Sequence, residues 1–216
     1  MKNYITLTIP IITGIFLFPS AGRIDLPFFW LATLMPVPLG ILLGPRIDPD
    51  LLKERTKPAP GGQDRHLRTL GAPCLFATLI IAGLDVGRFH WSDTVPVWGQ
   101  VLGLVVFAAG LAIGGWALVT NKFFSPVVRI QSERGHHVIT SGPYAYIRHP
   151  GYASTYFSWP ALSMALGSWW SLAPLAVMYM LVTRRLLLED KFLHENLPGY
   201  PEYAARVKYR VLPGVW

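Results

Sequence analysis

Cysteine is nearly absent from this sequence, and charged residues are scarce. Cys74 is the only cysteine and lies in an apolar stretch, so the chain builds neither a disulfide framework nor a thiolate metal site. Only 14% of the residues are charged, whereas an average soluble domain has about a quarter. Redox chemistry therefore has no support in the sequence, and the missing charge argues against an ordinary soluble domain.

Apolar residues are abundant in this sequence, and its net charge is positive. Hydrophobic residues make up 52% of the 216 positions, the formal net charge is +7, and the mean hydropathy is +0.38. No basic run alternates with aromatic residues, so nucleic acid is not an expected partner. An anionic membrane leaflet explains the charge better, and a lipid bilayer is the expected environment.

Six apolar segments predict an all-α fold, a polytopic bundle of about six short transmembrane helices. They are residues 4–18, 26–43, 69–84, 95–119, 152–166 and 169–188. A full crossing takes roughly 20 helical residues, so the first, third and fifth segments must tilt, borrow neighbours or stop short. Gly110 and Gly114 form a small-xxx-small pair, which predicts close helix packing, or alternatively a close approach of a cofactor.

The distribution of Lys and Arg predicts the orientation of the bundle. Lys2, the connections 46–68 and 122–148 and the tail from residue 184 hold 17 of the 19 basic residues, and the opposite side holds Arg23 and Arg88. Cytoplasmic loops are enriched in these residues, so both termini are expected in the cytoplasm. A signal peptide at the N-terminus is the alternative, but more membrane segments follow it and a first anchoring helix is simpler.

Polar residues concentrate in three pieces on the predicted cytoplasmic side: the Pro-Gly loop 58–62, the stretch 121–152 and the tail. In the second piece Gly142-Pro143 signals a turn and Pro150 suits the first turn of a helix, which sets Arg148 and His149 at the membrane surface. An alternative interpretation is that Arg148 extends its charged group to the membrane interface. In the same interpretation Tyr144, Tyr146 and Tyr152 form an aromatic belt there. His136, His137 and His149 lack acids at ligand spacing, so no metal site is predicted.

The tail supplies the opposite charge. On a continued sixth helix Arg185 and Glu189 share a face, and Asp190 and His194 share the neighbouring one. A solvated tail rarely keeps as many aromatic residues as 200–209 does. We therefore expect the tail to fold back onto the stretch 121–152.

These residues form a pattern that resembles a known family. The pieces are Gly-x-Tyr-x-x-x-Arg-His-Pro-x-Tyr over 142–152, the acidic pair Glu189-Asp190 and the ending 200–216. The chain resembles, over roughly its last 95 residues, the isoprenylcysteine carboxyl methyltransferases and the related membrane phospholipid methyltransferases. The family usually has two glutamates where this chain has Glu189 and Asp190.

The resemblance implies S-adenosyl-L-methionine as the methyl donor, and it assigns roles to residues. Arg148 and Glu189 are the candidate catalytic residues. For an ionised carboxylate acceptor we expect Arg148 to hold the carboxylate bidentately, whereas an amine acceptor would need a base, for which Glu189 and His149 are the candidates. The resemblance also implies one membrane domain over 1–216: anchoring helices in 1–90 and a catalytic core in 95–216, with a cofactor-binding loop 121–152 and a cytoplasmic cap that includes the tail 184–216. The cofactor-binding residues it implies are His136, Gly142, Tyr144, His149, Pro150, Tyr152, Glu189 and Asp190.

The expected function is methyl transfer to a lipophilic or lipidated acceptor at the cytoplasmic face of a membrane, of the bacterial inner-membrane kind. Carboxyl O-methylation of an isoprenylcysteine-like acceptor is the first hypothesis, with no metal required. The alternatives are phospholipid N-methyl or thiol S-methyl transfer on the same scaffold, a sterol-type membrane reductase that uses NADPH, and a membrane scaffold without enzymatic activity. A transporter is disfavoured because the predicted spans hold almost no ionisable residues.

Overall fold

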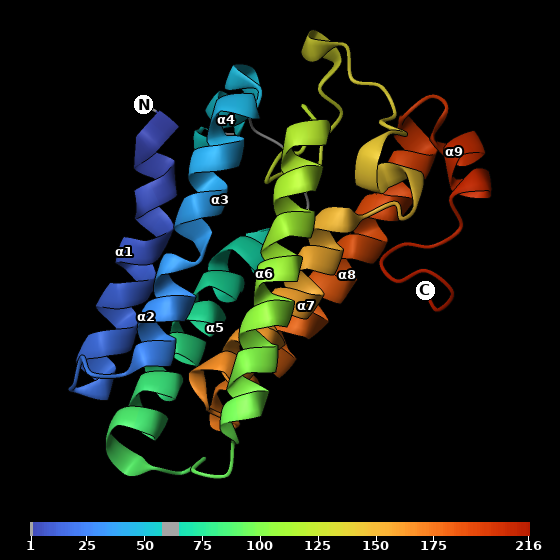
Figure 1. The fold of residues 1–216 in the computed structure, drawn as a ribbon. Helices are drawn as coiled ribbons and strands as arrows, with labels where there is room; N and C mark the ends of the chain where they lie inside the picture. The colour runs from blue at the N-terminus through green and yellow to red at the C-terminus, as the bar shows by residue number, and fades with distance from the viewer. Residues whose placement is uncertain (1, 58–64) are drawn as a thin grey trace.

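The computed structural model describes residues 2–57 and 65–216, and over these residues the chain is helical without any strand. The predicted all-α class is confirmed, whereas the Pro-Gly loop 58–62 lies outside the described residues. The helices are α1 (Lys2–Ala21), α2 (Pro27–Leu34), α3 (Pro36–Leu43), α4 (Pro49–Thr56), α5 (Arg65–Leu84), α6 (Val97–Thr120), α7 (Pro150–Leu166), α8 (Ala173–Asn196) and α9 (Tyr200–Arg206). Figure 1 shows the long helices side by side, with α4 and α9 near the upper end.

Each of the six predicted apolar segments contains helix. Among the described residues four helical stretches are long and apolar enough to cross a membrane, namely Pro27–Arg46, Leu70–Phe89, Val97–Thr120 and Trp170–Asn196. The apolar part of α1, Thr8–Ala21, is shorter, and α7 has 17 residues. Four candidate spans are therefore present, and crossing by all six segments stays a prediction.

The second predicted segment is divided at Met35 into α2 and α3. Pro36 and Pro38 follow the division, and neither has an N–H to bond the carbonyl four residues earlier. The helices of the first and third predicted segments, α1 and α5, also begin and end at other residues than the apolar runs do. α5 begins at Arg65 and continues through a π-turn, Asp85–Phe89, which gives it the length that the apolar run alone lacked.

The tightest helix pair in the bundle is α6 with α7. Gly103 lies so close to α7 that a Cβ there would come within 2.5 Å of the Ala165 backbone nitrogen, and one on Gly114 within 2.5 Å of Ser154 Oγ. Gly110 meets Ser158 in the same way. Small residues allow such close backbone approach between helices in lipid, so the predicted packing role of Gly110 and Gly114 is confirmed.

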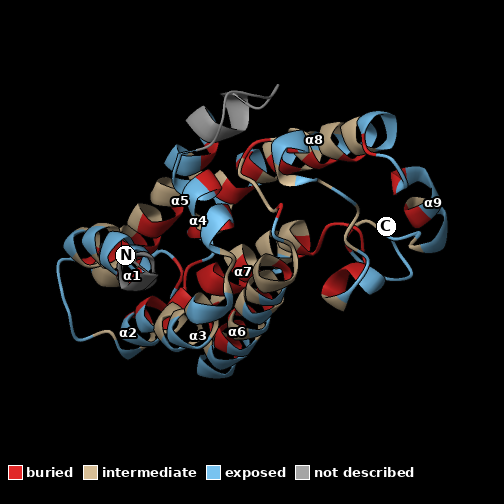
Figure 2. Cartoon of the chain, turned by 90° about the horizontal axis from the view of Figure 1, so that it is seen from above, coloured by how far each residue is buried: buried red, intermediate tan, exposed pale blue. Residues whose placement is uncertain are grey.

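Buried residues, red in the view from above, occur on most of the helices of the bundle (Figure 2). The largest apolar cluster includes Leu17 of α1, Phe29 of α2, Leu79 of α5, Phe107 of α6 and Leu166 of α7. Many outward residues are apolar too, among them Ile15, 60% exposed, and Val105, also 60% exposed. Apolar groups on both sides of a helix are typical of a bundle surrounded by lipid.

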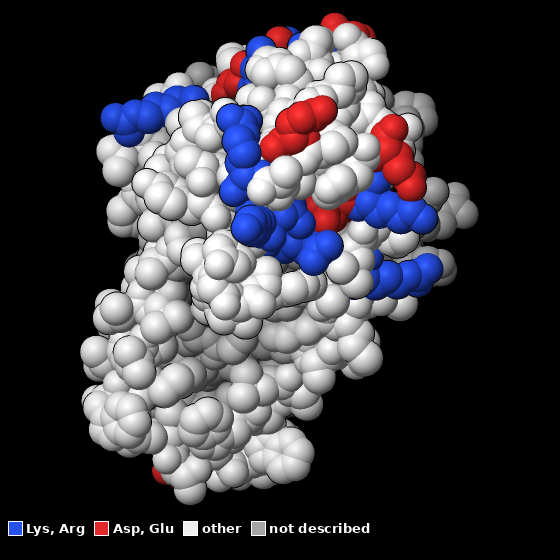
Figure 3. All heavy atoms as spheres, turned by 90° about the vertical axis from the view of Figure 1, so that its right-hand side faces the viewer, with Lys and Arg blue, Asp and Glu red and all other residues white. Residues whose placement is uncertain are grey.

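A buried carboxylate joins two loops at the lower end of the bundle. Asp85 is fully buried and accepts hydrogen bonds from the Ser92 backbone N–H (2.8 Å), Ser92 Oγ (2.6 Å) and Ser168 Oγ (2.5 Å). These bonds tie the connection after α5 to the connection after α7. The charged side chains in Figure 3 gather almost entirely at the opposite, upper end, where the stretch 121–149 and the C-terminal tail lie (Figure 1).

Candidate functional site

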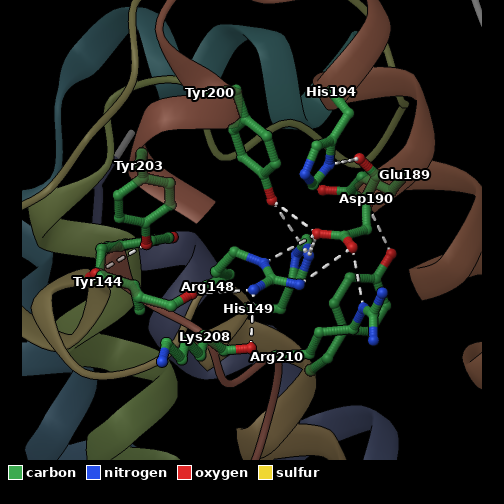
Figure 4. A network of polar contacts seen from close by, with 12 residues as sticks. Tyr144, Arg148, His149, Glu189, Asp190, His194, Tyr200, Tyr203, Lys208 and Arg210 are labelled. Atoms are coloured by element: carbon green, nitrogen blue, oxygen red, sulfur yellow. Dashed lines mark hydrogen bonds and ion pairs between the residues drawn. The ribbon is translucent and has the colours of Figure 1, made fainter. Parts of the chain in front are cut away.

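Asp190 is the centre of a buried network of charged and polar side chains (Figure 4). It lies on α8 and is 3% exposed. Its Oδ1 accepts from Arg148 Nε (3.1 Å) and Tyr200 OH (2.9 Å), and its Oδ2 from Arg148 Nη2 (3.2 Å) and Arg210 Nε (2.8 Å). His149 Nε2 lies 3.0 Å from the same Oδ1. One carboxylate thus joins the start of α7, α8, α9 and the tail.

Each of the three guanidinium nitrogens of Arg148 donates at least one hydrogen bond within the protein. Besides its paired contact with Asp190, its Nη1 donates to the carbonyl oxygens of Val207 (2.8 Å) and Lys208 (2.9 Å). Its side chain is 6% exposed, so the interpretation of Arg148 as a cation extended to the membrane interface is wrong. The bidentate contact expected for an acceptor carboxylate is made here with Asp190.

The tail folds back onto the stretch before α7, as predicted. The backbone N–H groups of Arg148 and His149 donate to the carbonyls of Tyr209 and Arg210, both at 2.9 Å. Tyr203 of α9 donates its hydroxyl to the Tyr144 carbonyl at 2.7 Å. Tyr144 is buried rather than in a belt at the interface, and burial raises the pKa of its phenol. Burial raises the pKa of the Tyr203 phenol as well, so both tyrosines stay neutral at physiological pH.

Local sequence explains how this stretch is placed. Gly142 has a φ of +58°, a left-handed conformation that glycine adopts without strain, and it packs on Trp116 and Thr120 of α6. Pro150 occupies the first turn of α7, where its missing N–H costs nothing. His149, just before it, is thereby fixed with its ring toward Asp190.

A hollow of about 730 Å³, including its open mouth, lies between this stretch, the residues after α6 and the end of α8. Most predicted site residues line it: His136, Tyr144, Arg148, His149, Pro150, Tyr152 and Glu189. Asp190 and Gly142 do not line it. Asp190 is enclosed by its own partners one residue from Glu189, and Gly142 faces α6. The space enclosed by its walls is about 80 Å³, which is smaller than the roughly 300–1,000 Å³ of typical ligand cavities, so the residues that line the hollow, and not its volume, mark it as the candidate site.

Glu189 and Tyr152 form one wall of this hollow. The Tyr152 hydroxyl donates to Glu189 Oε2 at 2.7 Å, and Arg185 Nε lies 3.9 Å from the same oxygen. The predicted i,i+4 pairing of Arg185 with Glu189 is therefore confirmed. Asp190 and His194 also share a face, because His194 contacts the Asp190 carbonyl through Nδ1 at 2.8 Å. The adjacent acids point to different places, Glu189 to the hollow and Asp190 to the buried network.

His136 closes the opposite side of the hollow. Its ring lies 4.5 Å from the Phe123 ring, centroid to centroid, and its Nδ1 accepts the Gln131 backbone N–H at 3.2 Å. Burial and the neighbouring charge of His137 lower the pKa of His136 to about 4. The ring is therefore neutral at pH 7 and holds the Gln131 turn as an acceptor.

The depressed pKa of His136 predicts acid sensitivity. An unfolded histidine protonates near pH 6.5, whereas the folded ring resists protonation until about pH 4. The unfolded state binds more protons in this window, so the contribution of His136 to stability is present above pH 6.5 and is lost as pH falls toward 4. We expect the melting temperature of His136→Asn to fall less between pH 7 and pH 5 than that of the natural protein.

The matched control for this pH prediction is His90→Asn, because His90 is an exposed histidine that does not line the hollow. It should keep the acid response of the natural protein. Equal acid responses in all three proteins would contradict the assigned role of His136.

Glu54 of α4 is a buried residue that sequence reasoning missed. It is 8% exposed, its Oε1 accepts from Arg129 Nε (3.0 Å) and Ser125 Oγ (2.9 Å), and its Oε2 accepts from Arg129 Nη2 (2.9 Å). The hydrogen bonds that Arg129 donates to Glu54 and Glu133 raise the pKa of Arg129. Arg129 and Ser125 both line the hollow, so α4 fixes one of its walls.

A sequence signal for α4 did exist. The Asp48 side chain accepts from the backbone N–H groups of Asp50 and Leu51, and Pro49 follows it at the first helical position. An aspartate before a proline is a typical start of a helix. Leu51 and Glu54, three residues apart, then share the buried face.

Comparison with known proteins shows which family the chain is similar to. A model described as the isoprenylcysteine carboxyl methyltransferase (ICMT) family matches residues 101–195. "Probable protein-S-isoprenylcysteine O-methyltransferase" of rice, Oryza sativa subsp. indica, is 34% identical over 110 residues, 49% of this chain and 57% of the rice protein. The chain thus spans little more than half the length of that relative.

Bacterial relatives align over more of the chain. The cobalt-zinc-cadmium resistance protein CzcN of Cupriavidus metallidurans is 30% identical over 158 residues, 68% of each protein. The nickel-cobalt-cadmium resistance protein NccN of Alcaligenes xylosoxydans xylosoxydans is 28% identical over 157 residues, 68% of this chain and 67% of that protein. The region matched by the family model, residues 101–195, includes the stretch 121–149, α7 and nearly all of α8, which carry most of the site.

Proposed function

The chain belongs to the isoprenylcysteine carboxyl methyltransferase family, and from this premise we propose that it is an S-adenosylmethionine-dependent methyltransferase of a lipophilic acceptor. The observation that carries the proposal is the hollow at the polar end of the bundle, lined by Glu189, Tyr152 and His136. We also propose that this end faces the cytoplasm, because 17 of the 19 Lys and Arg residues belong to it. The division into anchoring helices 1–90 and a catalytic core 95–216 remains part of the proposal.

The residues that line the hollow suit S-adenosylmethionine. The donor carries an adenine, ribose hydroxyls, an amino-acid head with both charges and a sulfonium cation. Glu189 suits the ammonium or the ribose hydroxyls, and the faces of Tyr152 and Phe124 suit a cation. Arg129 lies at the other side with a positive charge. Acidic, basic and aromatic groups are thus present in the same hollow.

The chemistry requires positioning more than a reactive side chain. When bound, S-adenosylmethionine would supply an electrophilic methyl group for in-line displacement, with S-adenosylhomocysteine as the leaving group. The protein contributes by holding its walls in place and by excluding water. The Asp190 network fixes the start of α7, and the Glu54 contacts fix the residues after α6. A carboxylate acceptor is ionised at neutral pH, so no general base is needed for it.

Carboxyl O-methylation of an isoprenylcysteine-like acceptor is the finer proposal. It comes from the family and from the printed name of the rice relative. We assign Arg148 the part of a positioning residue, because its guanidinium already holds Asp190 and the carbonyls of Val207 and Lys208. Phospholipid N-methyl and thiol S-methyl transfer would use the same hollow with another acceptor.

Cofactor protection tests the proposed reaction class. A ligand that binds only the folded state raises its stability in proportion to the logarithm of its concentration. We expect S-adenosylhomocysteine to raise the melting temperature of the detergent-solubilised protein, and NADPH to leave it unchanged. The reverse result would favour the reductase alternative. Labelled S-adenosylmethionine with a prenylcysteine, a lysophospholipid and a thiol would then identify the acceptor class.

A further inference from the structure

A second hollow lies between α5, α7 and α8. Its walls enclose about 400 Å³, which is within the roughly 300–1,000 Å³ of typical ligand cavities. Apolar side chains line much of it, among them Leu75, Trp159, Met178 and Val182. Both α5 and α8 belong to candidate membrane spans. The second hollow therefore gives an apolar chain a place inside the bundle.

The second hollow shares one wall with the hollow of the candidate site, the first hollow. Phe124, Ser125, Gly151, Tyr152 and Glu189 line both of them. In a transferase the donor and the acceptor must come together. A molecule with its polar head at the shared wall and its apolar tail in the second hollow meets this requirement, so the continuity favours the tail of the acceptor as the occupant.

The side of α7 that faces the second hollow changes from small residues to a large one. Gly151, Thr155 and Trp159 all line the hollow, and residues four apart lie on one face of a helix. Glycine and threonine leave room near the shared wall, whereas tryptophan has the largest kind of side chain. The room ends about 12 Å along α7, because each helical residue rises about 1.5 Å.

Two neighbouring helices complete the floor of the second hollow beside Trp159. Among the lining residues, Leu75 of α5 and Met178 of α8 lie farthest along their helices from the polar end. Met178 is 2% exposed, and it shares a buried apolar cluster with Leu175, on which Leu75 and Trp159 also pack. Packed side chains therefore close the hollow at this depth.

This depth limits the length of a tail that lies straight in the second hollow. With carbon–carbon bonds of about 1.5 Å, a depth of about 12 Å holds an extended chain of roughly ten carbon atoms. A longer tail must either enter the cluster around Met178 and Leu175 or bend out of the hollow toward lipid. Closely packed interiors resist added volume, so the extra length adds no favourable contact.

We propose that Trp159 determines the tail length of the acceptor, and that the preferred tail is an apolar chain of roughly ten carbon atoms. The tail lies along Thr155 and Val182 and ends on Trp159 and Met178, with the head at the shared wall. This proposal rests on the proposed transferase function. It adds the class of acceptor that the protein selects and the residue that selects it.

Photoreactive probes test the length limit in the full-length protein without any turnover. Each probe is an N-acetylcysteine thioether with a hexyl, decyl or pentadecyl tail and a diazirine at the tip of the tail. We expect the decyl probe to label Trp159 and Met178 at least about 10-fold more than the hexyl probe, since each methylene removed from water strengthens binding by up to about fourfold. The pentadecyl probe should label them no more than the decyl probe does.

Substitutions on α7 should move the preferred length in opposite directions. Trp159→Ala deepens the second hollow, so the pentadecyl probe should gain about 10-fold over the decyl probe and its labels should move to Leu175. Thr155→Leu places a large side chain one turn nearer the shared wall, about 6 Å above Trp159. The hexyl probe should then label this variant as strongly as the decyl probe.

Two control variants separate tail length from general damage to the fold. Trp159→Phe keeps an aromatic floor and should keep the natural order of the probes. Trp170→Ala is the matched control, because Trp170 is 58% exposed and lines neither hollow; it should label as the natural protein does. Protection of the melting temperature by S-adenosylhomocysteine, measured in each variant, reports on the first hollow.

The outcomes separate the length limit from the transferase function. Opposite shifts in Trp159→Ala and Thr155→Leu support the length limit. An unchanged order of the probes in both variants, with protection by S-adenosylhomocysteine retained, overturns the length limit and leaves the transferase function in place. Opposite shifts without protection in any variant or in the natural protein keep the tail site and overturn the transferase function.

Discussion

Asp190→Ala should destabilise the polar end of the protein more than any other single substitution at the site. The change leaves the guanidinium of Arg148 buried without its carboxylate, and it removes acceptors for Tyr200 and Arg210. Breaking a buried ion pair from one side costs about 3–5 kcal/mol. Thermal unfolding in detergent should show a large loss, and trypsin should cleave at Arg206 and Lys208 much faster.

The paired substitution distinguishes a lost counter-ion from lost packing. Arg148→Met combined with Asp190→Leu removes both charges and keeps much of the volume, so it should recover part of the stability that Asp190→Ala loses. The control is Glu195→Gln, because Glu195 lies on the same helix in an exposed pair with Lys191 at 3.8 Å. Unchanged protease resistance in Asp190→Ala would show that the network does not hold the tail.

The helices and the place of the site could be predicted from the sequence because both follow from local patterns. Apolar runs give the six helical segments, and the basic residues mark one end. Gly142-Pro143 and Pro150 fix a turn and a helix start, which carry Arg148 and His149 to that end. The aromatic tail could be expected to fold back because Tyr200 and Tyr203 are costly to leave in water.

The partner of each charge could not be predicted in the same way. Arg148 lies four residues after Tyr144, and Glu189 and Asp190 are adjacent in the sequence. No local pattern indicates which of these two acids pairs with Arg148. The fold decides it, since adjacent residues on α8 point about 100° apart and only Asp190 faces the tail. Arg148 was therefore expected to hold a ligand, whereas it holds Asp190.

The role of α4 depends equally on tertiary structure. Glu54 and Arg129 are 75 residues apart in the chain, and no short-range pattern joins them. In the sequence this helix is part of the basic connection 46–68. Its buried face becomes apparent only when α4 lies against the residues after α6.

Glu189→Gln should reduce methyl transfer strongly while the fold remains stable. Glutamine has nearly the same volume and its amide oxygen still accepts the Tyr152 hydroxyl, which Glu189 now accepts at 2.7 Å. It lacks the negative charge that Glu189 brings to the wall of the hollow. Hydrogen bonds to charged groups contribute about 1.5–3 kcal/mol, so we expect kcat/KM to fall roughly 10- to 100-fold.

The stability of Glu189→Gln must be measured together with its rate, because only a stable variant shows that the loss of activity comes from the lost charge. The melting temperature of Glu189→Gln should stay near that of the natural protein, whereas Asp190→Ala should unfold far earlier. Adjacent acids would then have separate tasks, one in the hollow and the other in the buried network. Glu195→Gln should change neither rate nor stability. If Glu189→Gln keeps the natural rate with every acceptor tested, the charge of Glu189 has no part in the transfer.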